Sequence, residues 1–123
     1  MNAIIPIDMY NHDLMVHFGS KKSLVDSLSK YVSKKAAEAS VKSIEGVTCG
    51  HMEFSDKLGV YYIWMPNVPN DNSSWATLQH EIFHFSVALM KKVGIPLSDD
   101  TEEAYAYLIG FLTKSVVDKF RIS

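Results

Sequence analysis

The sequence has few features that could cross-link the chain covalently or anchor it in a membrane. Cys49 is its only cysteine, which excludes an intrachain disulfide and suits a reducing compartment. No apolar stretch reaches the ~18 residues of a membrane span. The N-terminus also lacks the basic start and the long apolar run of a secretory signal peptide. We therefore expect a cytoplasmic protein that does not bind a membrane.

Excess charge of one sign is also missing. The formal net charge is −2, which argues against a nucleic-acid partner bound by neutralising phosphates. Six lysines lie in residues 21–42 beside Asp26 and Glu38, and we interpret them as one solvated helix face. Apolar residues make up 47% and charged residues 21% of the 123 residues. This is an ordinary globular composition, and we expect a single domain spanning residues 1–123.

The sequence does contain a pattern of short strands and longer helices. Period-two runs of β-branched and aromatic residues indicate strands, and apolar stripes at helical spacing indicate helices. The expected strands are residues 3–10, 14–18, 47–54 and 60–65, and the expected helices are residues 21–40, 74–93 and 101–120. The order ββαββαα predicts an α+β fold, with three helices packed against one face of a small, mostly antiparallel sheet.

Proline, glycine and small polar residues indicate where these elements end. Pro6 places the first strand at a sheet edge, because proline cannot donate to a strand ladder. Ser73 or Ser74 could cap the helix at 74–93, and Gly94 fits a left-handed C-terminal cap. The candidates to cap the last helix are Ser98, Asp99 and Asp100.

The segment His80-Glu81-Ile82-Phe83-His84 lies inside the expected helix at 74–93. Residues four apart project from the same helix face, so both imidazoles could reach one metal ion. Glu81 stands beside them, where a carboxylate could take a proton from a water that zinc has acidified. This is the logic of the HExxH motif, and it predicts a Zn²⁺ site with His80 and His84 as ligands and Glu81 as the catalytic base.

A third zinc ligand would have to come from outside this helix. The next expected helix opens with Glu102 and Glu103, and two helices joined by a short loop usually pack antiparallel. We choose Glu103 because it shares a stripe with Tyr107 and Gly110, and Glu102 is the fallback. Acidic residues also favour a helix N-terminus for electrostatic reasons alone, so a purely capping role remains open.

These residues resemble the gluzincin class of zinc metallopeptidases. The closest resemblance is to minimal domains such as the ImmA/IrrE-type peptidases found near phage and mobile-element regulators. The chain is also similar to small phage-encoded proteins that carry His-Glu-Ile-Phe-His followed by Glu-Glu-Ala-x-Ala-Tyr. The resemblance covers roughly residues 60–112. It implies a zincin-like fold, zinc bound by His80, His84 and Glu103, and a substrate-aligning strand at 60–65.

The chain departs from related classes at several positions. Val87 and Met90 stand where the metzincin extension needs glycine and histidine. The larger gluzincins have a separate histidine or tyrosine that stabilises the oxyanion. Tyr105, Tyr107 and His51 are the candidates here, and each is also explained by a structural role.

The other histidines carry less information. His12 is expected in a turn and His17 on a strand, and we interpret both as ordinary surface groups. Cys49 and His51 alternate on one expected strand, but a lone Cys-x-His is a weak metal signal.

Two functions are compatible with these residues and their spacing. The first is a zinc-dependent peptidase that cleaves an exposed segment of a protein or peptide substrate, encoded by a phage or mobile element. The second is a non-enzymatic interaction module, such as a phage accessory or virion protein, that keeps the fold with or without zinc. The sequence leaves the native metal and the oligomeric state open, since several divalent ions suit a His₂Glu site.

Overall fold

The computed structural model describes residues 1–122 and is built around a four-stranded mixed sheet. The strands are β1 (Asn2–Ile7), β2 (His12–Phe18), β3 (His51–Glu53) and β4 (Tyr62–Met65). Their order across the sheet is β1-β2-β4-β3. β1 pairs with β2 and β3 pairs with β4 in antiparallel fashion, whereas β2 and β4 run parallel. The predicted edge position of β1 is confirmed.

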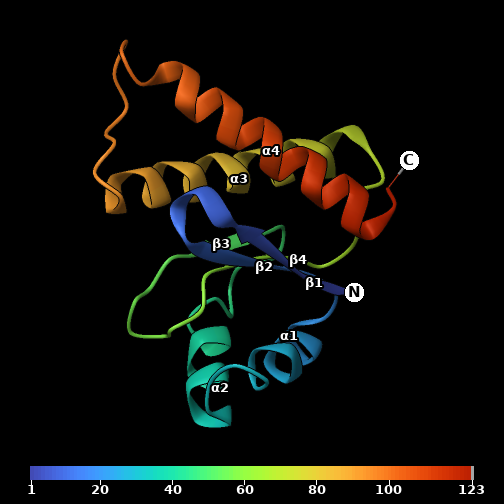
Figure 1. Ribbon diagram of the computed structural model, residues 1–123. Helices are drawn as coiled ribbons and strands as arrows, with labels where there is room; N and C mark the ends of the chain where they lie inside the picture. The colour runs from blue at the N-terminus through green and yellow to red at the C-terminus, as the bar shows by residue number, and fades with distance from the viewer. Residues whose placement is uncertain (123) are drawn as a thin grey trace.

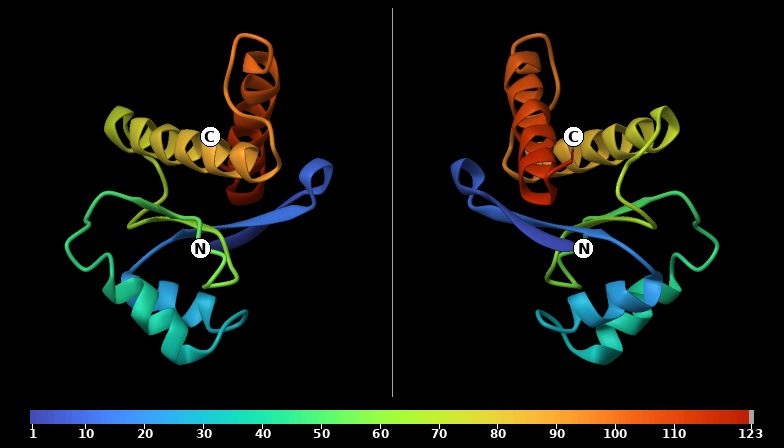
Figure 2. Two further views of the ribbon diagram at one scale, coloured as in Figure 1. Left: turned by 90° about the vertical axis from the view of Figure 1, so that its left-hand side faces the viewer. Right: turned by 90° about the vertical axis from the view of Figure 1, so that its right-hand side faces the viewer.

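Helices cover both faces of this sheet (Figures 1 and 2). α1 (Lys21–Leu28) and α2 (Lys34–Lys42) lie on one face. α3 (Asn72–Lys92) and α4 (Glu102–Phe120) lie on the other, over the larger apolar cluster. The expected arrangement with every helix on one face was wrong.

The two central strands, β2 and β4, explain why helices pack on both faces of the sheet. Residues 14–18 of β2 and all four residues of β4 are buried, so their side chains enter a core on each side of the sheet. A continuous buried run of this kind is typical of a strand in the middle of a layered sheet. Its parallel β2–β4 pairing requires a long crossover connection, which here contains α1 and α2.

The expected single helix at 21–40 is two helices, so the fold has four helices and not three. α1 ends at Leu28, and α2 starts after Ser33, whose side chain accepts a hydrogen bond from the amide of Ala36 at 3.1 Å. A serine that caps a new helix competes with continuation of the old one. The α+β class is confirmed.

The caps of the long helices differ in part from the expected ones. Asp71 is the N-cap of α3 and forms a reciprocal capping box with Ser74. Gly94 has φ +84°, as expected for a left-handed C-terminal position. Thr101 precedes α4 without a side-chain cap, and its hydroxyl donates instead to the carbonyl of Pro96 at 2.7 Å.

His17 is buried, so its interpretation as a surface group was wrong. One ring nitrogen is hydrogen-bonded to Asn2 Oδ1 at 3.0 Å and the other to Ser23 Oγ at 2.8 Å. Asn2 belongs to β1 and Ser23 to α1. The strand pattern of β2 alone does not show that these two elements lie next to His17. Among residues 1–122, no helix is both long enough and apolar enough to cross a membrane.

Candidate metal centre

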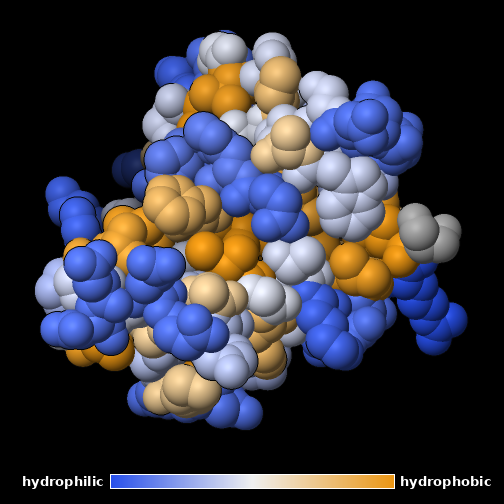
Figure 3. All heavy atoms as spheres, turned by 90° about the horizontal axis from the view of Figure 1, so that it is seen from above, coloured by the Kyte–Doolittle hydropathy of each residue, from blue (hydrophilic) through white to orange (hydrophobic). Residues whose placement is uncertain are grey.

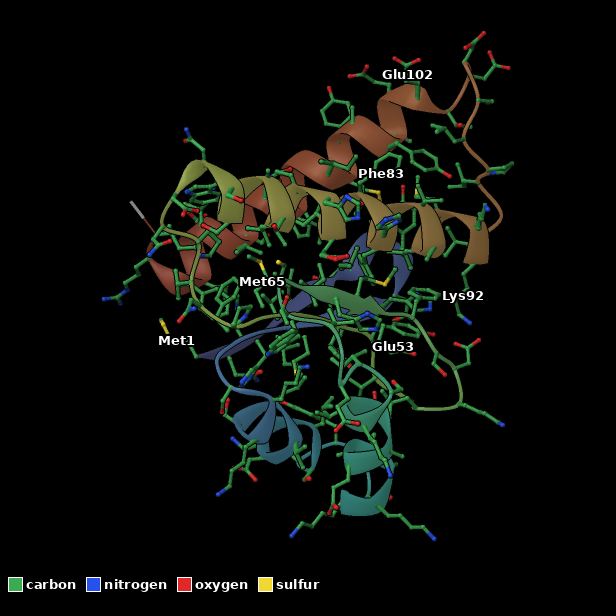
Figure 4. All side chains as sticks on the ribbon, turned by 180° about the vertical axis from the view of Figure 1, so that it is seen from behind. Met1, Glu53, Met65, Phe83, Lys92 and Glu102 are labelled. Atoms are coloured by element: carbon green, nitrogen blue, oxygen red, sulfur yellow. The ribbon has the colours of Figure 1, made fainter. Side chains whose placement is uncertain are left out.

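Helix α3 carries the two motif histidines on its solvent-facing side. Leu78, Ile82 and Phe85 point into the core between α3 and the sheet, and this fixes the rotation of the helix about its axis. Because His80 and His84 are one turn apart, they then emerge together on the exposed side. The side chains of α3 around Phe83 can be followed in Figure 4.

The two imidazoles already lie close enough to bind one ion. Their Nε2 atoms are 3.0 Å apart, and the rings meet edge to face with centroids separated by 4.5 Å. Two ligand nitrogens at normal zinc distances and a tetrahedral angle are about 3.3 Å apart. The pair therefore needs only a small adjustment to exchange its mutual hydrogen bond for a shared metal ion.

Glu81 lies beside these histidines but is only 7% exposed. Its side chain lines a shallow hollow of about 500 Å³ together with His80 and Thr77 of α3. Cys49 and Gly50, which precede β3, line the opposite side. A carboxylate in this position reaches solvent through the hollow while the core restrains its movement.

The hollow depends on a close approach between Gly50 and α3. A Cβ atom on Gly50 would lie 2.8 Å from Thr77 Cγ2 and 3.3 Å from Met65 Cγ. Only glycine fits this space without displacing a neighbour. The contact brings the start of β3 next to the helical turn that precedes His80.

The strand beside the histidines is β3 and not the predicted strand at 60–65. β4 lies between β2 and β3, with both of its edges paired, whereas β3 is at the edge of the sheet. The expectation that 60–65 offers an edge to a substrate was therefore wrong. A run as apolar as Tyr62–Met65 is typical of an interior strand, and an edge strand is usually short and partly polar.

Glu103 is not next to the two histidines. It lies exposed in the first turn of α4. α4 meets the motif region ten residues later, where Gln79 Nε2 donates to Thr113 Oγ1 at 3.1 Å. Ten residues of helix correspond to about 15 Å along the axis. Figure 4 shows Glu102, the fallback, at the same far end of α4.

The two helices cross steeply and do not lie side by side (Figure 2). α4 is held at its C-terminal end by Phe120, which packs on Phe18 of β2 with ring centroids 4.6 Å apart. Within residues 1–122, no group of three or more His, Cys, Asp and Glu side chains is arranged to hold a metal ion.

Two of the three candidates for oxyanion stabilisation are hydrogen-bonded elsewhere. Tyr105 is buried, and its hydroxyl donates to the carbonyl of Ile95 at 2.7 Å, tying α4 to the end of α3. His51 is hydrogen-bonded to Glu53 at 2.8 Å on the same strand. Tyr107 is exposed on α4.

An ion pair holds the loop between β3 and β4 to the end of α3. Lys92 Nζ lies 2.8 Å from Asp56 Oδ2, and Tyr61 donates its hydroxyl to the same carboxylate. The hydrogen bond from Lys92, followed by that from Tyr61, lowers the pKa of Asp56, and the pKa of Lys92 is raised in turn. Since the loop follows β3, this contact helps to keep the edge strand near α3.

Sequence reasoning missed the contribution of Ser73, Thr77, Cys49 and Gly50 to the hollow. Ser73 and Thr77 share a stripe with His80 and His84, so helical spacing could have identified them. No local signal could have identified Cys49 and Gly50, because they belong to another part of the chain. No protein-family model, curated protein or solved structure matches the chain.

Proposed function

We propose that this chain is a zinc-dependent metallopeptidase that hydrolyses a peptide bond in a protein partner. The observation that carries the proposal is the 3.0 Å separation of the His80 and His84 Nε2 atoms, which is close to the spacing of two zinc ligands. The resemblance of the motif to the gluzincin class, and with it a phage or mobile-element origin, belongs to the same proposal.

Each residue would have a defined role. His80 and His84 hold the metal, and Glu81 takes a proton from the attacking water and passes it to the leaving amine. Zinc, when bound, would polarise the scissile carbonyl and acidify that water. The exposed edge of β3 next to the hollow could pair with an extended substrate segment.

The third zinc ligand would have to come from outside α3. A catalytic zinc site normally has three protein ligands, and His80 and His84 supply two. Glu103 remains our choice for the third, with Glu102 as the fallback. Either one would have to approach through a movement of the first turn of α4, which precedes the contact of Thr113 with Gln79.

The incomplete ligand set favours a second candidate function. In that alternative the chain is a non-enzymatic interaction module, for example a phage accessory or virion protein, with or without bound zinc. The absence of a three-residue metal-ligating group from residues 1–122 is the observation that favours it.

The first test is the zinc content of protein purified without an affinity tag or chelator. We expect about one zinc per chain in the wild type and loss of zinc in His80→Ala/His84→Ala. His12→Ala, which changes the first residue of β2, is the matched control and should keep its zinc. Glu103→Ala and Glu102→Ala then identify the third ligand, because only the ligand's loss should weaken zinc binding.

The second test separates the enzyme from the module. Glu81→Gln should keep zinc and fold but lose cleavage of fluorescein-labelled casein by 100-fold or more, the range of general acid–base catalysis at ~10²–10⁴-fold. If the wild type binds no zinc even after zinc is added back, the metallopeptidase proposal is wrong. Zinc binding without casein cleavage in the wild type would favour the interaction module, and equal cleavage in Glu81→Gln would show that Glu81 is not the catalytic base.

A further inference from the structure

A second hollow lies at the opposite edge of the sheet, beside the end of β1. It has a volume of about 550 Å³ and is bounded by the tip of the β1–β2 hairpin and the N-terminal half of α4. Its lining includes Pro6, Ile7, Met9, Ala104, Tyr107 and Phe111. Figure 2 shows the hairpin tip rising beside α4. None of its lining residues belongs to the hollow beside His80.

Large apolar side chains are left open to solvent along this groove. Met9 is 83% exposed and Tyr107 is 73% exposed. In Figure 3, which views the molecule from above, apolar surface is visible among the polar side chains. Grouped exposed apolar residues are typical of a surface that contacts another molecule.

The α4 side of the groove has the spacing that receives a helix. Ala104, the neighbours Tyr107 and Leu108, and Phe111 follow at three- and four-residue intervals, one helical turn apart. Leu108 is buried toward the sheet, whereas Tyr107 and Phe111 stand at the outer margin. A ridge of this kind facing a second wall, here the hairpin tip, suits the apolar face of an amphipathic helix.

The charge around the groove indicates which residues the polar face of a bound helix would carry. Its walls, residues 6–10 and 104–111, contain Asp8 and no lysine or arginine, and four carboxylates come shortly before the α4 wall, at Asp99, Asp100, Glu102 and Glu103. Asp8 lines the groove itself, and Glu103 lies one turn before Tyr107 on the same stripe of α4. Within residues 1–122, neither carboxylate takes part in an ion pair. Such a rim attracts basic side chains and disfavours acidic ones.

A symmetric dimer fits this surface poorly. A two-fold contact places the same patch on both subunits, so the acidic rims of two copies would face each other. We propose that the groove binds a basic amphipathic helix of a partner protein, whose apolar side chains enter between the hairpin tip and α4. Its lysines or arginines face Asp8 at the tip of the β1–β2 hairpin. This proposal does not depend on zinc binding or on peptidase activity.

The probe is a fluorescein-labelled helical peptide of leucine and lysine with its leucines at helical spacing, followed by fluorescence anisotropy. A peptide with glutamate in place of lysine is its counterpart. We expect the wild type to bind the lysine peptide at least ten times more tightly than the glutamate peptide. Added salt should weaken the lysine complex, since exposed charges are screened.

Two pairs of variants locate the binding site. Tyr107→Ser/Phe111→Ser should weaken binding of the lysine peptide tenfold or more, because aromatic anchors dominate such contacts. Tyr31→Ser, which changes an exposed tyrosine in the connection between α1 and α2, is the matched control and should bind as the wild type does. Asp8→Lys should weaken binding, whereas Asp26→Lys on α1 should have little effect. Circular dichroism confirms that each variant is folded.

Three results would overturn the proposal. The first is equal binding of the two peptides, and the second is an equal loss in Tyr31→Ser and in Tyr107→Ser/Phe111→Ser. The third is a wild type that sediments as a dimer and becomes monomeric in Tyr107→Ser, which would make a second copy the occupant of the groove.

Discussion

At the scale of single residues, His17 links three parts of the molecule. Its ring is buried in β2 and joins Asn2 of β1 to Ser23 of α1. Burial, and then the positive charge of the Met1 amino group, lowers the pKa of His17 from 6.5 to about 4. The folded chain therefore keeps this imidazole neutral at a pH where an exposed histidine is protonated.

This difference makes stability depend on pH. Between pH 6.5 and 4 the unfolded chain takes up a proton at His17 and the folded chain does not, so the free energy of unfolding falls as the pH falls. The full shift corresponds to about 3 kcal/mol. Urea unfolding at pH 7, 5 and 4 should show this loss in the wild type, and a smaller one in His17→Gln.

His12→Ala is the control for that series, because His12, the first residue of β2, is only partly buried. It should lose stability with falling pH as the wild type does. An identical pH dependence in the wild type and in His17→Gln would show that other groups are responsible.

The sequence predicts some of these residues and misses others for a physical reason. The relation between His80 and His84 is set by one helical turn, so it follows from their spacing. The burial of His17 and the position of Glu103 depend on how separate elements pack. A strand pattern cannot show that α1 covers His17, and an acidic first turn cannot show where α4 crosses α3.

At the scale of elements, the contact between β3 and α3 determines the shape of the candidate metal centre. Gly50→Ala should push β3 away from α3, because the new Cβ would lie 2.8 Å from Thr77 Cγ2. We expect a loss of about 1–3 kcal/mol in the free energy of unfolding, as for other overpacked sites. Chemical denaturation measures this loss.

Two further variants show whether the clash is the cause. Gly46→Ala should cost little, since no atom lies within 4 Å of its Cβ position. Thr77→Ser removes the clashing methyl group and should recover part of the loss when combined with Gly50→Ala. If Gly46→Ala costs as much as Gly50→Ala, the effect belongs to glycine substitution in general.

The sequence predicts the elements better than it predicts their neighbours. Alternation and apolar stripes are local, so the β3–β4 hairpin and the helices α3 and α4 follow from them. The break at residues 29–33 is harder to predict, because Ser33 caps α2 inside a stretch that otherwise suits one helix. The interior place of β4 depends on its parallel pairing with β2, which no local pattern records.

At the scale of the whole molecule, two apolar layers of unequal size lie on either side of one sheet. The α3–α4 layer contains the larger buried cluster, and the α1–α2 layer the smaller one. Local opening is easier where fewer apolar groups are buried. We therefore expect the amides of α2 to exchange with deuterium faster than those at the centre of α3, measured by exchange mass spectrometry at pH 7.

Leu24→Ala provides the control, because Leu24 is fully buried in the smaller layer. The cavity should speed exchange in α1 and α2 while the amides of α3 change less. Equal acceleration in both layers would show that they unfold as one unit.

The central place of β4 also constrains the order in which a newly made chain can fold. The β1–β2 hairpin leaves the ribosome first, but β2 finds its second neighbour only when residues 62–65 emerge. β3 is made before β4 and has no other strand to pair with. Loop closure over this separation is slow compared with forming a hairpin. The early chain therefore carries an open apolar strand, and the turn with His80 and His84 is added only after the sheet can close.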